Sequence, residues 1–190
     1  LPQRLDELQM RYHEGPCVEA AVGFLVRAAP PLRQKEHRML PSDWACLLVN
    51  SLVEAAFLSF VLASCRAMPA LTPLFPLNLA FLAVGDDLLY APLHLLLYTP
   101  LLYRLVHSRH HRLTHPSRGY PHAILESPIE MAAALLLHSA LLVAGRPFLD
   151  AASVLAHVLC KAFFASLNHS GRRVSVFPVY SSLPHHTHHE

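Results

Sequence analysis

Long apolar stretches, separated by polar or proline-containing segments, dominate the pattern of the chain. Residues 44–65 contain a single charge, Glu54, and are long enough to cross a bilayer as a helix. A second stretch, residues 71–93, contains Pro76, an aspartate pair and Pro92. Because proline interrupts helical hydrogen bonding, this stretch predicts either a kinked span or a span followed by an interfacial helix.

Two further apolar stretches follow in the C-terminal half. Residues 131–145 and 148–168 are joined by the short turn 145–147, which predicts a helical hairpin. The pattern as a whole predicts an all-α integral membrane bundle of about four transmembrane helices. We expect residues 1–43 to form a polar cytoplasmic segment and residues 44–190 to form one membrane-embedded domain. The chain begins without methionine and ends on a motif, so we expect a fragment of a longer protein.

Composition agrees with a membrane protein. Hydrophobic residues make up 53% of the 190 positions and charged residues 15%, and the mean hydropathy is +0.33. A net charge of +2 with dispersed arginines argues against nucleic-acid binding. The cysteines lie far apart without a CxxC pair, which argues against a thiolate zinc site and against a disulfide framework. They are Cys17, Cys46, Cys65 and Cys160.

Basic residues predict the orientation of the bundle. They are concentrated in the first forty positions and again between the second and third spans, and the two intervening loops hold only Arg66 and Arg146. Since basic loops mark the cytoplasmic side, both basic segments are expected in the cytoplasm. With four crossings, the histidine-rich segments around His94, 107–111, His169 and 185–189 all emerge on that side. An odd number of intervening spans would have separated them.

Two histidine boxes share the pattern HxxHH. HSRHH gives His107, His110 and His111, and HHTHH gives His185, His188 and His189. On a helix, positions i, i+3 and i+4 share one face, so three imidazoles converge. Neutral imidazole binds iron, zinc and copper, and two such boxes offer more ligands than one tetrahedral zinc requires. The pattern favours two metals; the alternative is a histidine-rich exposed surface that binds metal opportunistically.

The two boxes, with LNHSG at 167–171 between them, resemble the fatty acid hydroxylase/sterol desaturase superfamily. Its members are membrane-bound, histidine-ligated di-iron oxygenases, typically of the endoplasmic reticulum. The resemblance extends from about Asp86 to Glu190. In DDLLYAPLHLLLY (86–98) His94 matches the family's first box, but Tyr98 stands where its second histidine is expected. In SPIE (127–130) the proline and glutamate match, whereas Ser127 replaces a histidine.

The resemblance implies a ligand set and a group of supporting residues. The implied metal ligands are His94, His107, His110, His111, His169, His185, His188 and His189. Residues expected to orient them are Asp86, Asp87, Tyr98 and Glu130, with helix capping as the alternative role for the two aspartates. We expect His138, His157 and Lys161 to be interhelical polar groups and His115, His122 and His186 to face solvent.

The resemblance also implies an activity. It predicts an oxidoreductase that hydroxylates or desaturates a fatty acyl or sterol lipid, with two iron ions as cofactors and dioxygen as co-substrate. Zinc is expected in purified or inactive forms. No GxGxxG motif occurs, so electrons are expected from a cytochrome b-type donor and an NAD(P)H-dependent reductase. Arg104, Arg109 and Arg112 are expected either to dock that donor or to act only as topology signals. The alternatives are a catalytically degenerate relative and a non-redox zinc-binding membrane protein.

Overall fold

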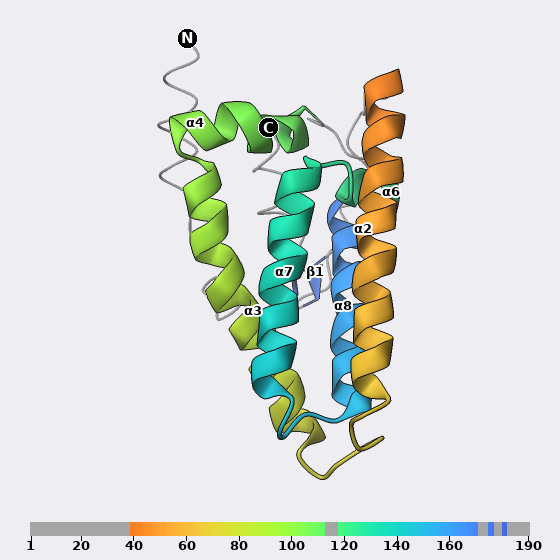
Figure 1. The fold of residues 1–190 in the computed structure, drawn as a ribbon. Helices are drawn as coiled ribbons and strands as arrows, with labels where there is room; N and C mark the ends of the chain where they lie inside the picture. Colours follow the sequence, from red (N-terminus) through yellow and green to blue (C-terminus); the bar gives the residue numbers. More distant parts are fainter. Residues whose placement is uncertain (1–38, 113–117, 171–174, 177–179, 182–190) are drawn as a thin grey trace.

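A computed structural model describes residues 39–112, 118–170, 175–176 and 180–181. Its long helices are α2 (Pro41–Cys65), α3 (Phe75–Leu97), α7 (Pro128–Gly145) and α8 (Ala151–Asn168). Each of the four is long and apolar enough to cross a membrane. They run antiparallel in sequence order, and Figure 1 shows them side by side as one bundle. The prediction of an all-α bundle with four candidate spans is confirmed.

Prolines begin these helices instead of breaking them. Pro41, Pro76 and Pro128 each lie in the first two positions of a long helix, where the missing N–H would have no intrahelical partner. Pro92 lies inside α3, which nevertheless continues to Leu97. The second span is therefore one helix, and the alternative of a span followed by a separate interfacial helix over 71–93 is wrong.

Short helices close one end of the bundle. α4 (Pro100–Leu102), the π-helical turn η2 (Tyr103–His107) and α5 (Ser108–His111) follow α3 and cross the upper end in Figure 1. α6 (Tyr120–Ala123) precedes α7 at the same end.

Two short strands follow α8. They are β1 (Ser175–Val176) and β2 (Tyr180–Ser181), and they pair antiparallel with Ser175 opposite Ser181.

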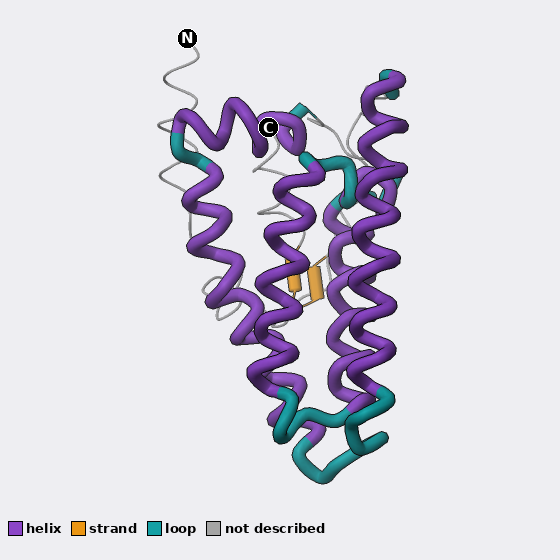
Figure 2. The backbone as a smooth tube through the Cα atoms, in the orientation of Figure 1, coloured by secondary structure: helices purple, strands orange, loops and turns teal. Residues whose placement is uncertain are grey.

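The order of the helices around the bundle differs from a simple succession of hairpins. α7 packs mainly on α2 and α3, and α3 packs on both α7 and α8. The turn at 145–147 reverses the chain, as predicted, but α7 and α8 lie diagonally across the bundle from each other. The loops at the lower end of Figure 2 carry these connections. α3 thus lies between the two later helices, and polar side chains on it can meet both.

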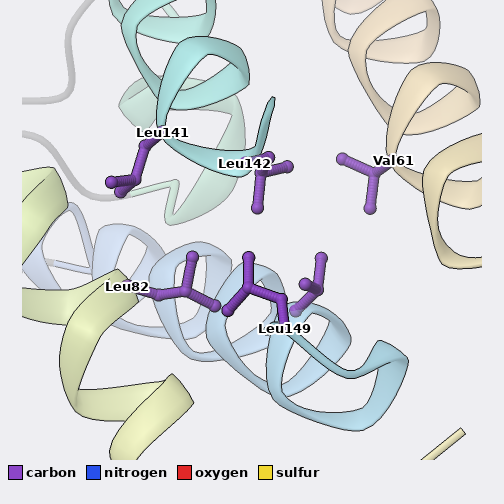
Figure 3. Packing of buried hydrophobic residues seen from close by; sticks show 6 residues of the cluster. Val61, Leu82, Leu141, Leu142 and Leu149 are labelled. Carbon is purple, nitrogen blue, oxygen red and sulfur yellow. The ribbon is translucent and has the colours of Figure 1, made fainter. Parts of the chain in front are cut away.

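The apolar core occupies the half of the bundle nearest these lower loops. Leu82, Leu142, Leu149 and Val61 extend into a common space (Figure 3), and Leu141 belongs to the same buried cluster. Large apolar side chains on the outer faces remain exposed in all four long helices. Such largely apolar outer faces are typical of helices surrounded by lipid. The other half of the bundle buries polar residues.

Asp150 connects the two loops at the lower end. Its Oδ1 accepts a hydrogen bond from the Ser153 amide at 2.8 Å, and its Oδ2 accepts from Asn78 Nδ2 at 2.7 Å and from Thr72 Oγ1 at 2.9 Å. Burial acts to raise the pKa of Asp150, but these hydrogen bonds outweigh it and hold the pKa below its ordinary value. The ionised carboxylate therefore caps α8 and anchors α3 and its preceding loop.

Candidate metal centre

Three segments converge at the upper end of the bundle. His94 lies in the last turn of α3, His107 ends η2, and Glu130 lies in the first turn of α7. One potential ligand atom from each lies within 4.8 Å of the other two. His107 is 0% exposed and Glu130 is 1% exposed. The short helices across the bundle end therefore bring a histidine box onto the start of α7.

Glu130 has the contacts expected of a metal-site carboxylate. Its Oε1 lies 2.8 Å from Nδ1 of His107. Because an ionised carboxylate only accepts hydrogen bonds, Nδ1–H of His107 donates, and Nε2 of the neutral ring carries the lone pair. Oε2 of Glu130 is buried and has no hydrogen-bond partner in the part of the chain that the structure describes. A buried carboxylate oxygen without a partner is costly, and a bound cation would satisfy it. The residues present therefore fit a metal ion.

The first histidine box lies at a change of helix type. The chain passes from the π-helical turn into α5 directly after His107. Nε2 of His111 lies 3.0 Å from Nε2 of His107, and the His107 and His110 rings are stacked with centroids 5.7 Å apart. The predicted convergence of this box is confirmed. π-helical turns are often found at functional sites, and the sequence did not predict this one.

His169 completes the described cluster from α8. It caps the C-terminal end of that helix, and its ring centroid lies 5.6 Å from that of His110. Five of the eight implied ligands thus gather at one end, as the count of spans predicts. The other three, His185, His188 and His189, lie outside the described residues, as do His115 and His186.

Tyr98, which stands where the family resemblance predicts a histidine, contacts the histidine cluster. Its hydroxyl lies 3.0 Å from Nε2 of His111, and its ring meets those of His94 and His107 edge to face. Burial, with smaller contributions from Tyr103 and Glu130, raises the pKa of Tyr98 above its ordinary value. The phenol therefore stays protonated and serves the histidines as a hydrogen-bonding group.

His111 is held in the form that binds metals. Burial, followed by the electrostatic interaction with His107, lowers the pKa of His111 to about 4. At neutral pH the imidazole is therefore uncharged, and it can offer a nitrogen lone pair.

An ion-pair cluster holds the box helix to α2, which the sequence alone did not indicate. Asp43, fully buried in the first turn of α2, accepts from Arg112 Nη2 at 2.6 Å and from Arg109 Nη1 at 3.5 Å. Its other oxygen accepts from the Leu40 amide at 2.9 Å. Two of the three arginines assigned to donor docking or topology therefore also position the histidine box.

The remaining predicted residues have different surroundings. Asp86 is buried, and its hydrogen bonds in the structure go to His138 and Lys161 instead of to the implied ligands. Asp87 is exposed. The prediction that His122 faces solvent is wrong, because its side chain is fully buried. The short helix α6 turns His122 inward, and no pattern in the sequence around His122 indicates that burial.

Asp86, His138 and His157 form a second compact group, with potential ligand atoms also within 4.8 Å of one another. They connect α3, α7 and α8, as expected for interhelical polar residues.

Comparison with protein-family models, curated proteins and solved structures found no match for this chain. In the part that the structure describes, the chain is thus a four-span helical membrane protein in which two buried groups of histidine and carboxylate side chains could hold metal ions.

Proposed function

We propose that the chain is a membrane-bound, iron-dependent oxygenase that hydroxylates or desaturates a lipid, fatty acyl or sterol. The observation that carries this proposal is the convergence of His94, His107 and Glu130, with a buried carboxylate oxygen that lacks a hydrogen-bond partner in the described residues. The histidine-box resemblance to the fatty acid hydroxylase/sterol desaturase superfamily supplies the reaction class.

The ligand atoms suit iron but also zinc, because imidazole and carboxylate bind both. Bound iron would supply reductive activation of dioxygen. The chain's own residues prepare the site. Glu130 orients the His107 ring through Nδ1, and Tyr98 fixes His111 through its hydroxyl. Burial keeps His111 neutral, so the ligands are ready before a metal arrives.

The surroundings of the site suit a lipid substrate. Outward-facing leucines of the segment that crosses the bundle end, Leu101 and Leu105, are exposed close in sequence to His107. Such a segment, apolar on its outer face and followed by arginines, is typical of the membrane interface. A lipid chain lying against α3 and η2 could therefore reach the histidines without leaving the bilayer.

Electrons have to come from another protein. We propose a cytochrome b-type donor supplied by an NAD(P)H-dependent reductase, with the endoplasmic reticulum as the location. The Arg109 side chain is 32% exposed and that of Arg112 is 39% exposed although both pair with Asp43, so they keep surface charge for an acidic donor.

The test is an oxygenation assay on the full chain, loaded with iron and reconstituted in lipid with the donor and its reductase. Under ¹⁸O₂, we expect lipid products carrying ¹⁸O if the reaction is hydroxylation, or new double bonds if it is desaturation. The products should disappear in His107→Ala and persist in Glu126→Gln. An iron-loaded chain that oxidises no lipid would contradict the proposal. Zinc retained without turnover would favour the non-redox alternative.

A further inference from the structure

A second polar group lies halfway along the bundle, within the predicted spans. Asp86 is central in α3, His138 in α7, and His157 lies in the second turn of α8. His138 is 2% exposed and His157 is 5% exposed. Ionisable side chains in this position are expensive in a membrane, and they usually mark a functional site.

The hydrogen bonds of this group leave two imidazole nitrogens available. Nδ1 of His138 donates to Oδ1 of Asp86 at 2.8 Å, so Nε2 of the neutral ring carries the lone pair. The His157 ring stacks on that of His138, with centroids 5.2 Å apart and planes 5° from parallel. Nε2 of each ring is buried and has no hydrogen-bond partner among the described residues.

We propose that His138 and His157, with Asp86 as their carboxylate partner, bind a divalent transition-metal ion in the middle of the membrane. Neutral imidazoles bind Zn²⁺ and Fe²⁺, and a nearby carboxylate balances the charge of the ion. The hydrogen bond from His138 to Asp86 is also the carboxylate–histidine contact that fixes ligand rings in metal sites. A bound ion would satisfy both nitrogens, which an apolar interior otherwise leaves unsatisfied.

This site is separate from the histidine-box centre. Asp86 precedes His94 by eight residues on α3, and Glu130 precedes His138 by eight residues on α7. A helix rises 1.5 Å per residue, so both helices place the two groups about 12 Å apart along the bundle. Metals that share one catalytic centre lie about 3.5–4 Å apart. The two groups therefore form two sites instead of the halves of a di-metal centre.

Lys161 gives the site a way to exist without metal. Its ammonium pairs with Oδ2 of Asp86, which keeps the group electrically neutral. The Lys161 side chain is 47% exposed, so it can move away along the outer face of α8. A divalent cation held by the two imidazoles would then balance the charge of the carboxylate in place of the ammonium. The Lys161 ammonium thus competes with the metal ion for the negative charge of Asp86.

The experiment uses the full chain, purified without metal, in a His107→Ala/His111→Ala/His188→Ala/His189→Ala background that removes two histidines from each box and so disables the other centre. Co²⁺ is titrated and followed by its visible absorption bands. We expect about one Co²⁺ per chain, in line with one ion per ligand set. His157→Gln should abolish these bands, whereas Lys161→Met should bind Co²⁺ more tightly. His122→Gln, at a buried histidine outside both groups, is the matched control and should leave binding unchanged.

Absence of Co²⁺ bands in this background, or bands that persist in His157→Gln, would overturn the site. Tighter binding in Lys161→Met cannot come from misfolding, so this variant keeps the test decisive if His157→Gln fails to fold. Equal or weaker binding in Lys161→Met would count against the site. Because the histidine-box centre is disabled in every variant, this experiment does not test the oxygenase proposal, which is tested separately by the oxygenation assay.

Discussion

Replacing Glu130 with glutamine tests the histidine-box centre with almost no change of shape. The amide oxygen of the introduced glutamine can still accept from Nδ1 of His107, but the negative charge and one potential ligand oxygen are lost. We therefore expect Glu130→Gln to weaken metal binding while leaving the metal-free fold nearly unchanged.

The expected magnitudes follow from the contacts of Glu130. Loss of a carboxylate that orients a ligand histidine typically lowers metal affinity by about 10–100-fold, or about 1.4–2.7 kcal/mol. In the metal-free chain the hydrogen bond from His107 loses its charge assistance, which costs about 1 kcal/mol. Removing a buried charge whose second oxygen has no partner in the described residues offsets this loss. The thermal midpoint of the metal-free protein should therefore change little.

The assay is a competitive Fe²⁺ or Zn²⁺ titration of detergent-purified protein, with a thermal unfolding curve of each metal-free sample. Glu126→Gln is the matched control, in the loop just before α7. Burial, with the charges of Glu130 and Glu54, raises the pKa of Glu126 well above its ordinary value, so the substitution replaces one neutral group by another. An affinity of Glu130→Gln within about threefold of the parent, which is below the tenfold expected, would refute the reasoning.

Three further predictions concern the scaffold. Asp43→Asn removes the ion pairs to the box helix, so we expect a loss of about 1–2 kcal/mol and a lower iron content, read by thermal unfolding and elemental analysis; an unchanged iron content would contradict the positioning role. Gly85→Ala places a Cβ 2.8 Å from Leu141 Cδ1, so we expect up to about 1–3 kcal/mol of destabilisation from crowding, and a stability equal to the parent would show that the Leu141 side chain moves aside. Asp150→Asn should destabilise the protein at neutral pH by about 1 kcal/mol. Because the folded pKa of Asp150 lies below its unfolded value, this difference should shrink as the pH falls below about 4, and a pH-independent difference in unfolding midpoint would argue against it.

The four spans and the convergence of the first histidine box were predictable because both depend on regular helical spacing. Apolar length defines a span, and positions i, i+3 and i+4 meet on any helix. The parity of four crossings then placed His94, His107 and His169 at the same end. These inferences need no knowledge of which helices are neighbours.

Features that depend on helix neighbours were not predictable. The diagonal placement of α7 and α8 brings His138 onto His157 and Asp86, and no local pattern encodes that meeting. Likewise, the sequence indicates only that Asp43 lies near the start of a helix. In the structure it forms ion pairs with Arg109 and Arg112, which lie far along the chain. Burial of His122 arises from the fold of a short connecting helix, which polarity alone does not reveal.

The most direct test of the central claim is the iron content of the full chain, expressed with sufficient iron, purified in detergent and measured by elemental analysis. A His107→Ala/His110→Ala variant is measured beside it. We predict iron in at least an equimolar amount to the chain in the parent and its loss from the histidine-box site in the variant. A parent that stays free of iron, under conditions where a control oxygenase retains its metal, would contradict the account.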